Sequence, residues 1–366
     1  MGVRGTGLVA TLAAIWFALA AVPSVQAASV SNSILVGGYA RPVLMDPSTG
    51  KVRKLPAFNA AREETALRTT DGRALITAYQ RAGAAWVERY SLMDGNVTAI
   101  GPFAVSGSES LPWALSPDGR EVVTVTRTSS TVPGTNIGSD GPIRVDRLDL
   151  DALTAMPLIG PIPAQPRGGQ GDTQTEWFAA FSFSPDGRQL AYIHRHQWML
   201  TGAPAGDVPF RRLMLMAPDG SGARSVADLA GDASDIAWSP DSRRIAAGTT
   251  NGLRIVDVAA STPPVNVTSG PTDGASFSSS GRFLAYVPLN ATGRGKLRIL
   301  DLKTRTSITV AKLGFAGALS WAPKQDVIAV CAGKRYNTLY RVSGNGTAKE
   351  LSSKYCRPVW GPTPGP

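Results

Sequence analysis

The sequence predicts an all-β protein, a single β-propeller with seven four-stranded blades, and three observations lead to this prediction. The 366 residues include 39 glycines and 27 prolines, which favour frequent turns and disfavour long helices. A turn of the type Ser-Pro-Asp-Gly-Arg recurs along the chain between short apolar strands. Successive turns are 39 to 68 residues apart, and repeats of about 40 residues with four strands each are typical of propellers.

Each residue of the recurring turn has a physical role. Proline presets φ at the first central position, aspartate bonds its own backbone, and glycine adopts the left-handed conformation that closes the hairpin. Ser242 stands where four of the turns have glycine, and we expect that turn to persist with some strain. The six occurrences are Thr69–Arg73, Ser116–Arg120, Ser184–Arg188, Ser239–Arg243, Ser278–Arg282 and Ala322–Asp326.

The shortest repeat shows how one blade is built. It predicts four antiparallel strands at Ser234–Ser239, Arg244–Thr249, Leu253–Val258 and Val265–Ser269. Tryptophans recur at one repeat position, and we expect them to pack between blades; they are Trp238, Trp321 and Trp360. This repeat resembles the WD-repeat-like repeat of the TolB family and of prolyl oligopeptidase propellers, over nearly all of Ile34 to Pro362.

The resemblance implies the fold and no more. TolB proteins carry an N-terminal α/β domain before the propeller, and we expect none here because the first strand follows soon after residue 27. Neither the TolB role nor any partner-binding residue of that family is therefore carried over.

The two ends of the chain predict how the ring closes. Arg357–Pro362 resembles an inner strand, but the chain stops four residues later. Ile34–Gly38, Pro42–Met45 and Val52–Leu55 supply three strands with no inner strand before them. Joining both ends completes a seventh blade and removes the exposed sheet edges of an open array. Counts of six or eight blades stay open, because the long second repeat could lack or hide a blade.

The chain has two cysteines, Cys331 and Cys356. In the expected ring, Cys331 ends the second strand of the last complete blade, and Cys356 begins the inner strand of the closing blade. Both positions lie on the same face of neighbouring blades. A disulfide between them is one expectation for an exported protein. The alternative is two buried thiols too far apart to bridge.

Residues 1–27 have the pattern of a secretory signal peptide, and residues 28–366 are the predicted propeller domain. Arg4 precedes an apolar run from Leu8 to Val22, and Val25 and Ala27 fit the positions that a signal peptidase reads. The run is shorter than the roughly 20 residues that a spanning helix needs. We expect a secreted or cell-envelope protein with no membrane span, and a membrane anchor is the alternative.

Few motifs point to catalysis or to a cofactor. The sequence has no Gly-x-Ser-x-Gly elbow, phosphate-binding glycine loop, dinucleotide fingerprint or EF-hand loop. His194 and His196 are the two histidines, and their spacing on a strand points both rings to one face, where they could hold a metal with a carboxylate. Two ligands are a weak signal, so we expect no catalytic residue, no metal and no cofactor.

Three insertions, at Thr128–Gly141, Gly160–Glu176 and Gln197–Pro209, lengthen the second and third repeats. Loops between second and third strands and loops joining blades leave a propeller on the same face, so the insertions crowd one sector of one rim. Rigid scaffolds commonly carry their binding sites on such loops. The alternative is irregular excursions without a ligand. The expected binding residues are Arg167, Asp172, Glu176, Trp177, Arg195, His196, Trp198 and Asp207.

The sequence thus predicts an exported, noncatalytic propeller that binds a protein or an anionic cell-envelope polymer through one rim, as a monomer. The net charge of +10 comes from basic residues spread along the chain, so we expect no nucleic-acid ligand. The alternative is a propeller enzyme, a lyase or hydrolase acting on a glycan or small ester at the channel mouth. Some propeller lyases with a similar repeat have a site with several histidines around a metal. This chain has two histidines, which favours the binding hypothesis over the enzyme hypothesis.

Overall fold

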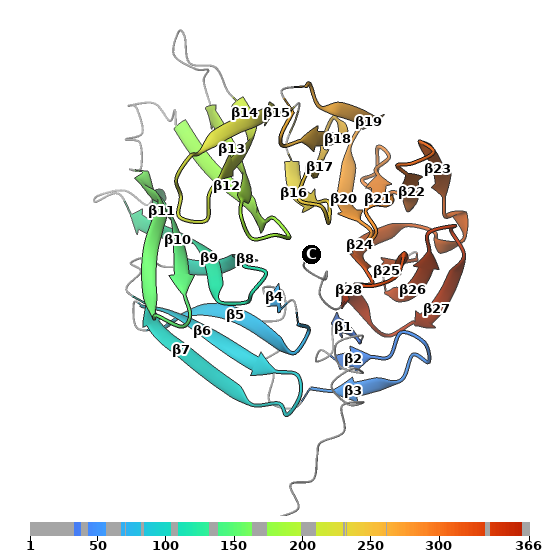
Figure 1. The fold of residues 1–366 in the computed structure, drawn as a ribbon, viewed down its shortest axis with the longest axis horizontal. Helices are drawn as coiled ribbons and strands as arrows, with labels where there is room; N and C mark the ends of the chain where they lie inside the picture. Colours follow the sequence, from blue (N-terminus) through green and yellow to red (C-terminus); the bar gives the residue numbers. More distant parts are fainter. Residues whose placement is uncertain are drawn as a thin grey trace, which may run out of the picture.

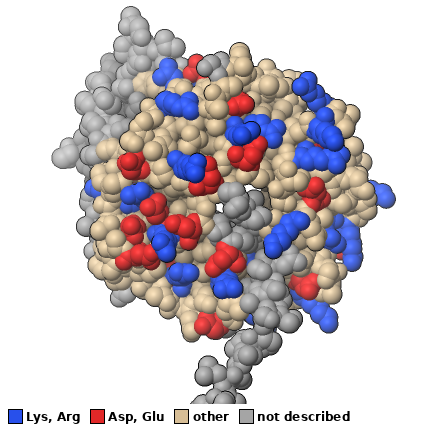
Figure 2. Space-filling model, viewed as in Figure 1, with Lys and Arg blue, Asp and Glu red and all other residues tan. Residues whose placement is uncertain are grey.

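The structure, a computed structural model, describes residues 33–37, 43–55, 67–69, 71–81, 84–103, 109–131, 138–162, 174–198, 210–229, 231, 233–260, 262–333 and 337–360. In these residues, 28 strands form seven antiparallel four-stranded sheets, arranged as blades around a common axis (Figure 1). An opening lies at the centre of the ring (Figure 2). The predicted single seven-bladed propeller is confirmed.

Six blades are continuous in sequence, and each runs from its innermost to its outermost strand. Blade 1 consists of β4 (Leu67–Arg68), β5 (Ala74–Arg81), β6 (Ala84–Ser91) and β7 (Val97–Phe103). Blade 2 consists of β8 (Glu109–Leu115), β9 (Glu121–Thr131), β10 (Gly138–Asp149) and β11 (Thr154–Ile162). Blade 3 consists of β12 (Gln174–Phe183), β13 (Leu190–Trp198), β14 (Phe210–Met216) and β15 (Arg224–Asp228).

The following three blades have shorter strands. Blade 4 consists of β16 (Ala233–Trp238), β17 (Arg244–Thr249), β18 (Gly252–Asp257) and β19 (Val265–Ser269). Blade 5 consists of β20 (Thr272–Phe277), β21 (Phe283–Pro288), β22 (Arg298–Asp301) and β23 (Thr306–Thr309), followed by the 3-10 turn η2 (Ala311–Leu313). Blade 6 consists of β24 (Ala316–Trp321), β25 (Val327–Ala332), β26 (Thr338–Ser343) and β27 (Ala348–Ser352).

Blade 7 closes the ring with strands from both ends of the chain, as predicted. Its order is β28 (Cys356–Trp360), β1 (Ile34–Gly37), β2 (Val43–Met45) and β3 (Val52–Lys54). The register pairs Ile34 with Trp360 and Leu35 with Val359. The first strand along the chain therefore pairs with the last, so β1 has a hydrogen-bonded neighbour on both sides and is not an exposed edge strand.

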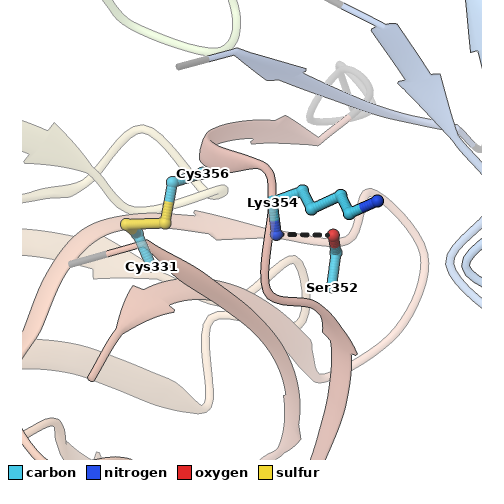
Figure 3. Close-up of a disulfide and its surroundings, with 4 residues drawn as sticks. All are labelled: Cys331, Ser352, Lys354 and Cys356. Carbon is cyan, nitrogen blue, oxygen red and sulfur yellow. Dashed lines mark hydrogen bonds between the residues drawn. A yellow bond between two sulfur atoms is a disulfide. The ribbon is translucent and has the colours of Figure 1, made fainter. Parts of the chain in front are cut away.

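The predicted disulfide is present, and it joins the closing blade to its neighbour (Figure 3). Cys331 lies near the end of β25 in blade 6, and Cys356 begins β28 in blade 7, with their Cα atoms 5.2 Å apart. The backbone N–H of Lys354 donates to Ser352 Oγ at 3.1 Å in the segment that leads into β28. Blade 7 is thus held by both backbone pairing and a covalent bond.

The recurring turns lie at the ends of the innermost strands, on what we call the turn face. In blade 3, Ser184 Oγ donates to Asp186 Oδ1 at 2.6 Å, and the N–H of Arg188 donates to the same oxygen at 3.1 Å. Ser242 adopts a φ of 57°, the left-handed conformation that glycine adopts in four of the other turns. Its Oγ accepts a bond from the N–H of Asp186 at 3.2 Å, which links the turns of blades 3 and 4.

The recurring tryptophans pack between blades, as predicted. Trp238, Trp321 and Trp360 are 8%, 6% and 4% exposed. Trp238 Nε1 donates to the carbonyl of Ser182 at 3.0 Å, so the indole of blade 4 bonds the inner strand of blade 3. Trp321 makes the same contact from blade 6 to Ser276 of blade 5 at 2.8 Å. Each contact satisfies a buried indole N–H and ties neighbouring inner strands together.

Two expectations from the sequence, a signal peptide and the absence of a membrane span, concern the chain as a whole. The predicted signal peptide, residues 1–27, falls outside the described part of the chain. Within the part that is described, no helix is long and apolar enough to cross a membrane.

Candidate functional site

Blades 2 and 3 extend beyond the other blades on the face where the innermost strands begin, which we call the start face. β9 and β10 have 11 and 12 residues, whereas β17 and β18 of blade 4 have six each. In both hairpins, β9–β10 and β17–β18, the strand pairing starts at the opposite face of the ring. The additional residues of β9 and β10 therefore lie at the start face. At about 3.3 Å per residue, the hairpin of blade 2 extends roughly 15–20 Å farther.

The expected loops are therefore partly strand. The insertion predicted at residues 128–141 continues β9 to Thr131 and begins β10 at Gly138. The other two insertions likewise lose residues to β11, β12 and β13 at their ends. The sequence reasoning placed the insertions correctly on blades 2 and 3, but it missed that Thr- and Ser-rich segments lengthen the hairpins.

The predicted rim residues fall into two groups. Arg167, Asp172 and Asp207 lie outside the described residues. The remaining five lie on two paired strands of blade 3, where Glu176 is opposite His196 and Trp177 is opposite Arg195. Trp198 ends β13, opposite Gln174 at the start of β12. These five are thus brought together at the projecting end of one hairpin.

A row of stacked rings, the aromatic–histidine row, runs along blade 3 toward the start face. It consists of Phe178, His194, Phe210 and His196. The Phe178 and His194 rings stack with centroids 4.7 Å apart, His194 meets Phe210 edge-on at 4.9 Å, and His196 stacks on Phe210 at 5.3 Å. Both histidine rings therefore lie on one face of β13, as their spacing predicts.

The two ends of the row are buried, and the His194 and Phe210 rings between them are partly exposed. Phe178 and His196 are each 3% exposed, and Phe178 packs in the core between blades 2 and 3 with Val125 and Val145. At the outer side, the Arg212 guanidinium lies 4.3 Å from the Phe210 centroid and forms an exposed ion pair with Asp228 at 3.3 Å. Rings and guanidinium groups arranged in this way can bind another molecule by stacking and by charge. Among the described residues, no three or more His, Cys, Asp or Glu side chains gather as metal ligands would.

A second feature, absent from the sequence reasoning, is a cavity at the ring axis. It has a volume of 410 Å³ and is lined by interior residues of the innermost strands β16, β20 and β24. Two carboxylates, Asp235 and Asp273, border it together with small and aliphatic residues. The cavity therefore lies along the inner strands of blades 4 to 6. Its lining residues are Asp235, Ile236, Ala237, Asp273, Gly274, Ala275, Ser276, Gly317, Ala318 and Leu319.

The environment of Asp235 favours its protonated form. Asp235 is exposed by area, because it borders the cavity, yet the narrow walls keep most water away from its carboxyl. This desolvation raises the pKa of Asp235 to about 6, and the nearby charge of Asp273 raises it further, against hydrogen bonds from the N–H groups of Ile236 and Ala275. A carboxyl with a raised pKa in a cavity is a recurrent property of functional sites.

The charges on the visible face of the ring are mixed. Acidic and basic side chains are interspersed around the blades, and acidic side chains are among those that border the central opening (Figure 2). The cavity itself is bordered by two acidic residues, Asp235 and Asp273, although the chain has a net charge of +10. Asp235 and Asp273 stand at different positions of the repeat, three residues before Trp238 and four before Phe277, so the repeat does not reveal the cavity.

Comparisons with known proteins support the fold. No protein-family model and no curated protein matches the chain. The tricorn protease is similar in structure, with a TM-score of 0.57 and 12% identity over 91% of this chain and 34% of that one. An oligogalacturonate lyase from Vibrio parahaemolyticus has a TM-score of 0.55 and 13% identity over 87% and 85%. TolB from Acinetobacter baumannii has a TM-score of 0.47 and 14% identity over 92% and 84%. The first two likenesses agree with the β-propeller fold predicted from the repeated turns.

Proposed function

We propose that this chain is an exported propeller that binds a protein or a cell-envelope polymer on the start face of blades 2 and 3. The observation that carries the proposal is the aromatic–histidine row, in which the partly exposed rings of His194 and Phe210 lie between the buried rings of Phe178 and His196. Aromatic and arginine side chains are common anchors of interfaces, and Arg212 lies beside the row.

A rigid framework supports such a binding surface. Phe178 is fixed in the core with Val125 and Val145, so the His194 ring that stacks on it is held in place before a partner arrives. Less conformational entropy is then lost on binding. The disulfide between Cys331 and Cys356 supports export, because such bonds persist in oxidising compartments.

Site-specific photocrosslinking tests which face binds. A photoreactive amino acid replaces Arg212, on the start face of blade 3, or Arg188, an exposed residue on the turn face of the same blade. We expect crosslinked adducts with the native cell envelope from position 212 and none from position 188. Protease digestion or glycan-degrading enzymes then distinguish a protein from a polymer in the adduct. Equal yields from both positions would argue against a binding surface on the start face.

A further inference from the structure

The cavity at the ring axis lies on blades 4 to 6, away from the aromatic–histidine row of blade 3, and it uses none of the predicted rim residues. Its volume of 410 Å³ is within the range of small-molecule sites, roughly 300–1,000 Å³. It is formed by three consecutive inner strands, so its walls are fixed by the pairing of β16, β20 and β24 within their blades.

The two carboxylates come from adjacent blades. Asp235 is on β16 and Asp273 is on β20, and the Asp235 carboxyl accepts a hydrogen bond from the N–H of Ala275 across the blade boundary. Their like charges repel each other, so a cation placed between them relieves this repulsion as well as forming its own ion pairs. β24 contributes Gly317, Ala318 and Leu319, so Asp235 and Asp273 are the titratable groups among the lining residues.

The rest of the lining fits a hydrocarbon stem. Ile236 and Leu319 supply aliphatic surface, and Gly274 and Gly317 leave room where side chains would narrow the cavity. A basic side chain has this combination, with a charged head and three or four methylene groups that pack on apolar surface. Arginine in particular presents several donors to carboxylates in a fixed geometry.

We propose that the axial cavity binds the basic side chain of a protein partner, with Asp235 and Asp273 holding the charged head and Ile236 and Leu319 contacting the stem. A bare divalent ion fits less well, because the cavity is far larger than an ion and the described residues bring two carboxylates there, without a third acidic, His or Cys ligand. This proposal goes beyond the rim site, since it concerns other blades and other residues.

Binding is expected to depend on pH through Asp235. Its carboxyl must be ionised to pair with a cation, and its pKa is about 6. The ionised fraction falls about tenfold between pH 7 and pH 5, so the affinity for a cation is expected to fall by up to about tenfold over the same range.

Calorimetric titration of the full chain with N-acetyl-arginine amide tests the proposal, and the neutral isostere N-acetyl-citrulline amide serves as the matched ligand. We expect the arginine compound to bind at pH 7 with a Kd on the order of 1 mM and the citrulline compound not to bind. Asp235→Asn and Asp273→Asn should each weaken binding at least tenfold. Asp151→Asn, which changes an exposed carboxylate on blade 2, should leave it unchanged.

Three outcomes would overturn the proposal: no binding of the arginine compound, equal binding of the citrulline compound, or unchanged binding in both cavity variants. Tighter binding of Mn²⁺ that is lost with the same two variants would assign the cavity to a metal and would also overturn it. Thermal unfolding of each variant shows whether a lost signal reflects lost structure. None of these results bears on the proposed rim site, because photocrosslinking from position 212 tests that site separately.

Discussion

Asp235 reduces the stability of the folded ring at neutral pH. Its pKa rises from 3.8 to about 6 because the cavity walls desolvate the carboxyl. An acid whose pKa is higher in the folded state binds its proton more tightly there, so it does not destabilise the fold below about pH 4. The loss of stability develops as the pH rises from about 4 to 6 and is complete above that range. A residue that reduces stability in this way is typical of a functional site.

The substitution Asp235→Asn should therefore stabilise the protein at neutral pH. The amide keeps an oxygen that accepts the N–H groups of Ile236 and Ala275, and it removes the charge. We expect the thermal unfolding temperature at pH 7.5 to rise by about 2 °C, and the gain to vanish near pH 3.5. Differential scanning calorimetry across this pH range measures it. A gain that does not change with pH would show that desolvation of the charge is not its cause.

Single residues differ in how far the sequence predicts them. Ser242 aligned with the glycines of other turns, and its left-handed conformation follows from that alignment. Arg68 occupies the place in blade 1 that tryptophan takes in other blades, and its Nη1 donates to the carbonyl of Ser33 in blade 7 at 2.8 Å. Burial lowers the pKa of Arg68 to about 10, and the charge of Asp71 opposes this. This contact joins residues 35 positions apart, so no local pattern could reveal it.

The closing blade is the element in which both ends of the chain meet. β28 pairs with β1, and the disulfide connects β28 to β25 of blade 6. The sequence predicted the strand pairing, because the last inner strand lacked a blade and the first three strands lacked an inner strand, and it offered the disulfide as one of two alternatives. The chemistry of the cysteines could not decide between a disulfide and two thiols; the geometry of neighbouring blades decides it.

Removal of the disulfide by Cys331→Ser with Cys356→Ser should lower the free energy of unfolding. The bond closes a loop over a sequence separation of 25, for which the chain-entropy model gives about 3.5 kcal/mol. Guanidinium unfolding of the variant and of the wild type, each with and without a reducing agent, measures the loss. The reduced wild type should match the variant, and the variant should not respond to the reducing agent. An unchanged unfolding free energy would show that β-strand pairing alone closes the ring.

The long hairpins of blades 2 and 3 mark the limit of prediction for elements. Repeat spacing located the additional residues, because the turns before and after them were recognisable. Their conformation was missed, since segments rich in Thr, Ser and Gly are typical of loops as well as of exposed strands. Tertiary pairing, such as Ser139 with Ser130, extends β9 and β10 beyond what local propensity indicates.

For the whole molecule, the ring was predictable and the axial cavity was not. The repeat predicted seven blades, with six and eight left open, and it places the turns on one face. Asp235 is three residues before Trp238, whereas Asp273 is four before Phe277, so the two carboxylates occupy different repeat positions. Register shifts between Ala233 and Asp235 and between Asp273 and Ala275 bring both to the cavity. Such shifts leave no clear pattern in a single sequence.

The two candidate sites lie on different blades. The rim site offers rings and arginines on blade 3, and the cavity offers carboxylates on blades 4 to 6. A protein partner that contacts both would present apolar or aromatic groups to the rim and a basic side chain to the axis. The turn face has exposed arginines in its hairpin turns. One of them, Arg120, forms an ion pair with Asp151 at 3.4 Å.

The central claim is that the rim of blades 2 and 3 binds the partner, and a loop-replacement experiment tests it most directly. One variant replaces residues 163–173, between β11 and β12, with a short Gly-Ser linker; the control variant replaces residues 290–294 on the start face of blade 5 with the same linker. Both variants must unfold at the wild-type temperature. Binding isotherms of the labelled proteins on the cell-envelope fraction should show at least a tenfold weaker affinity for the first variant and no change for the control. Wild-type affinity in the 163–173 variant would contradict the account.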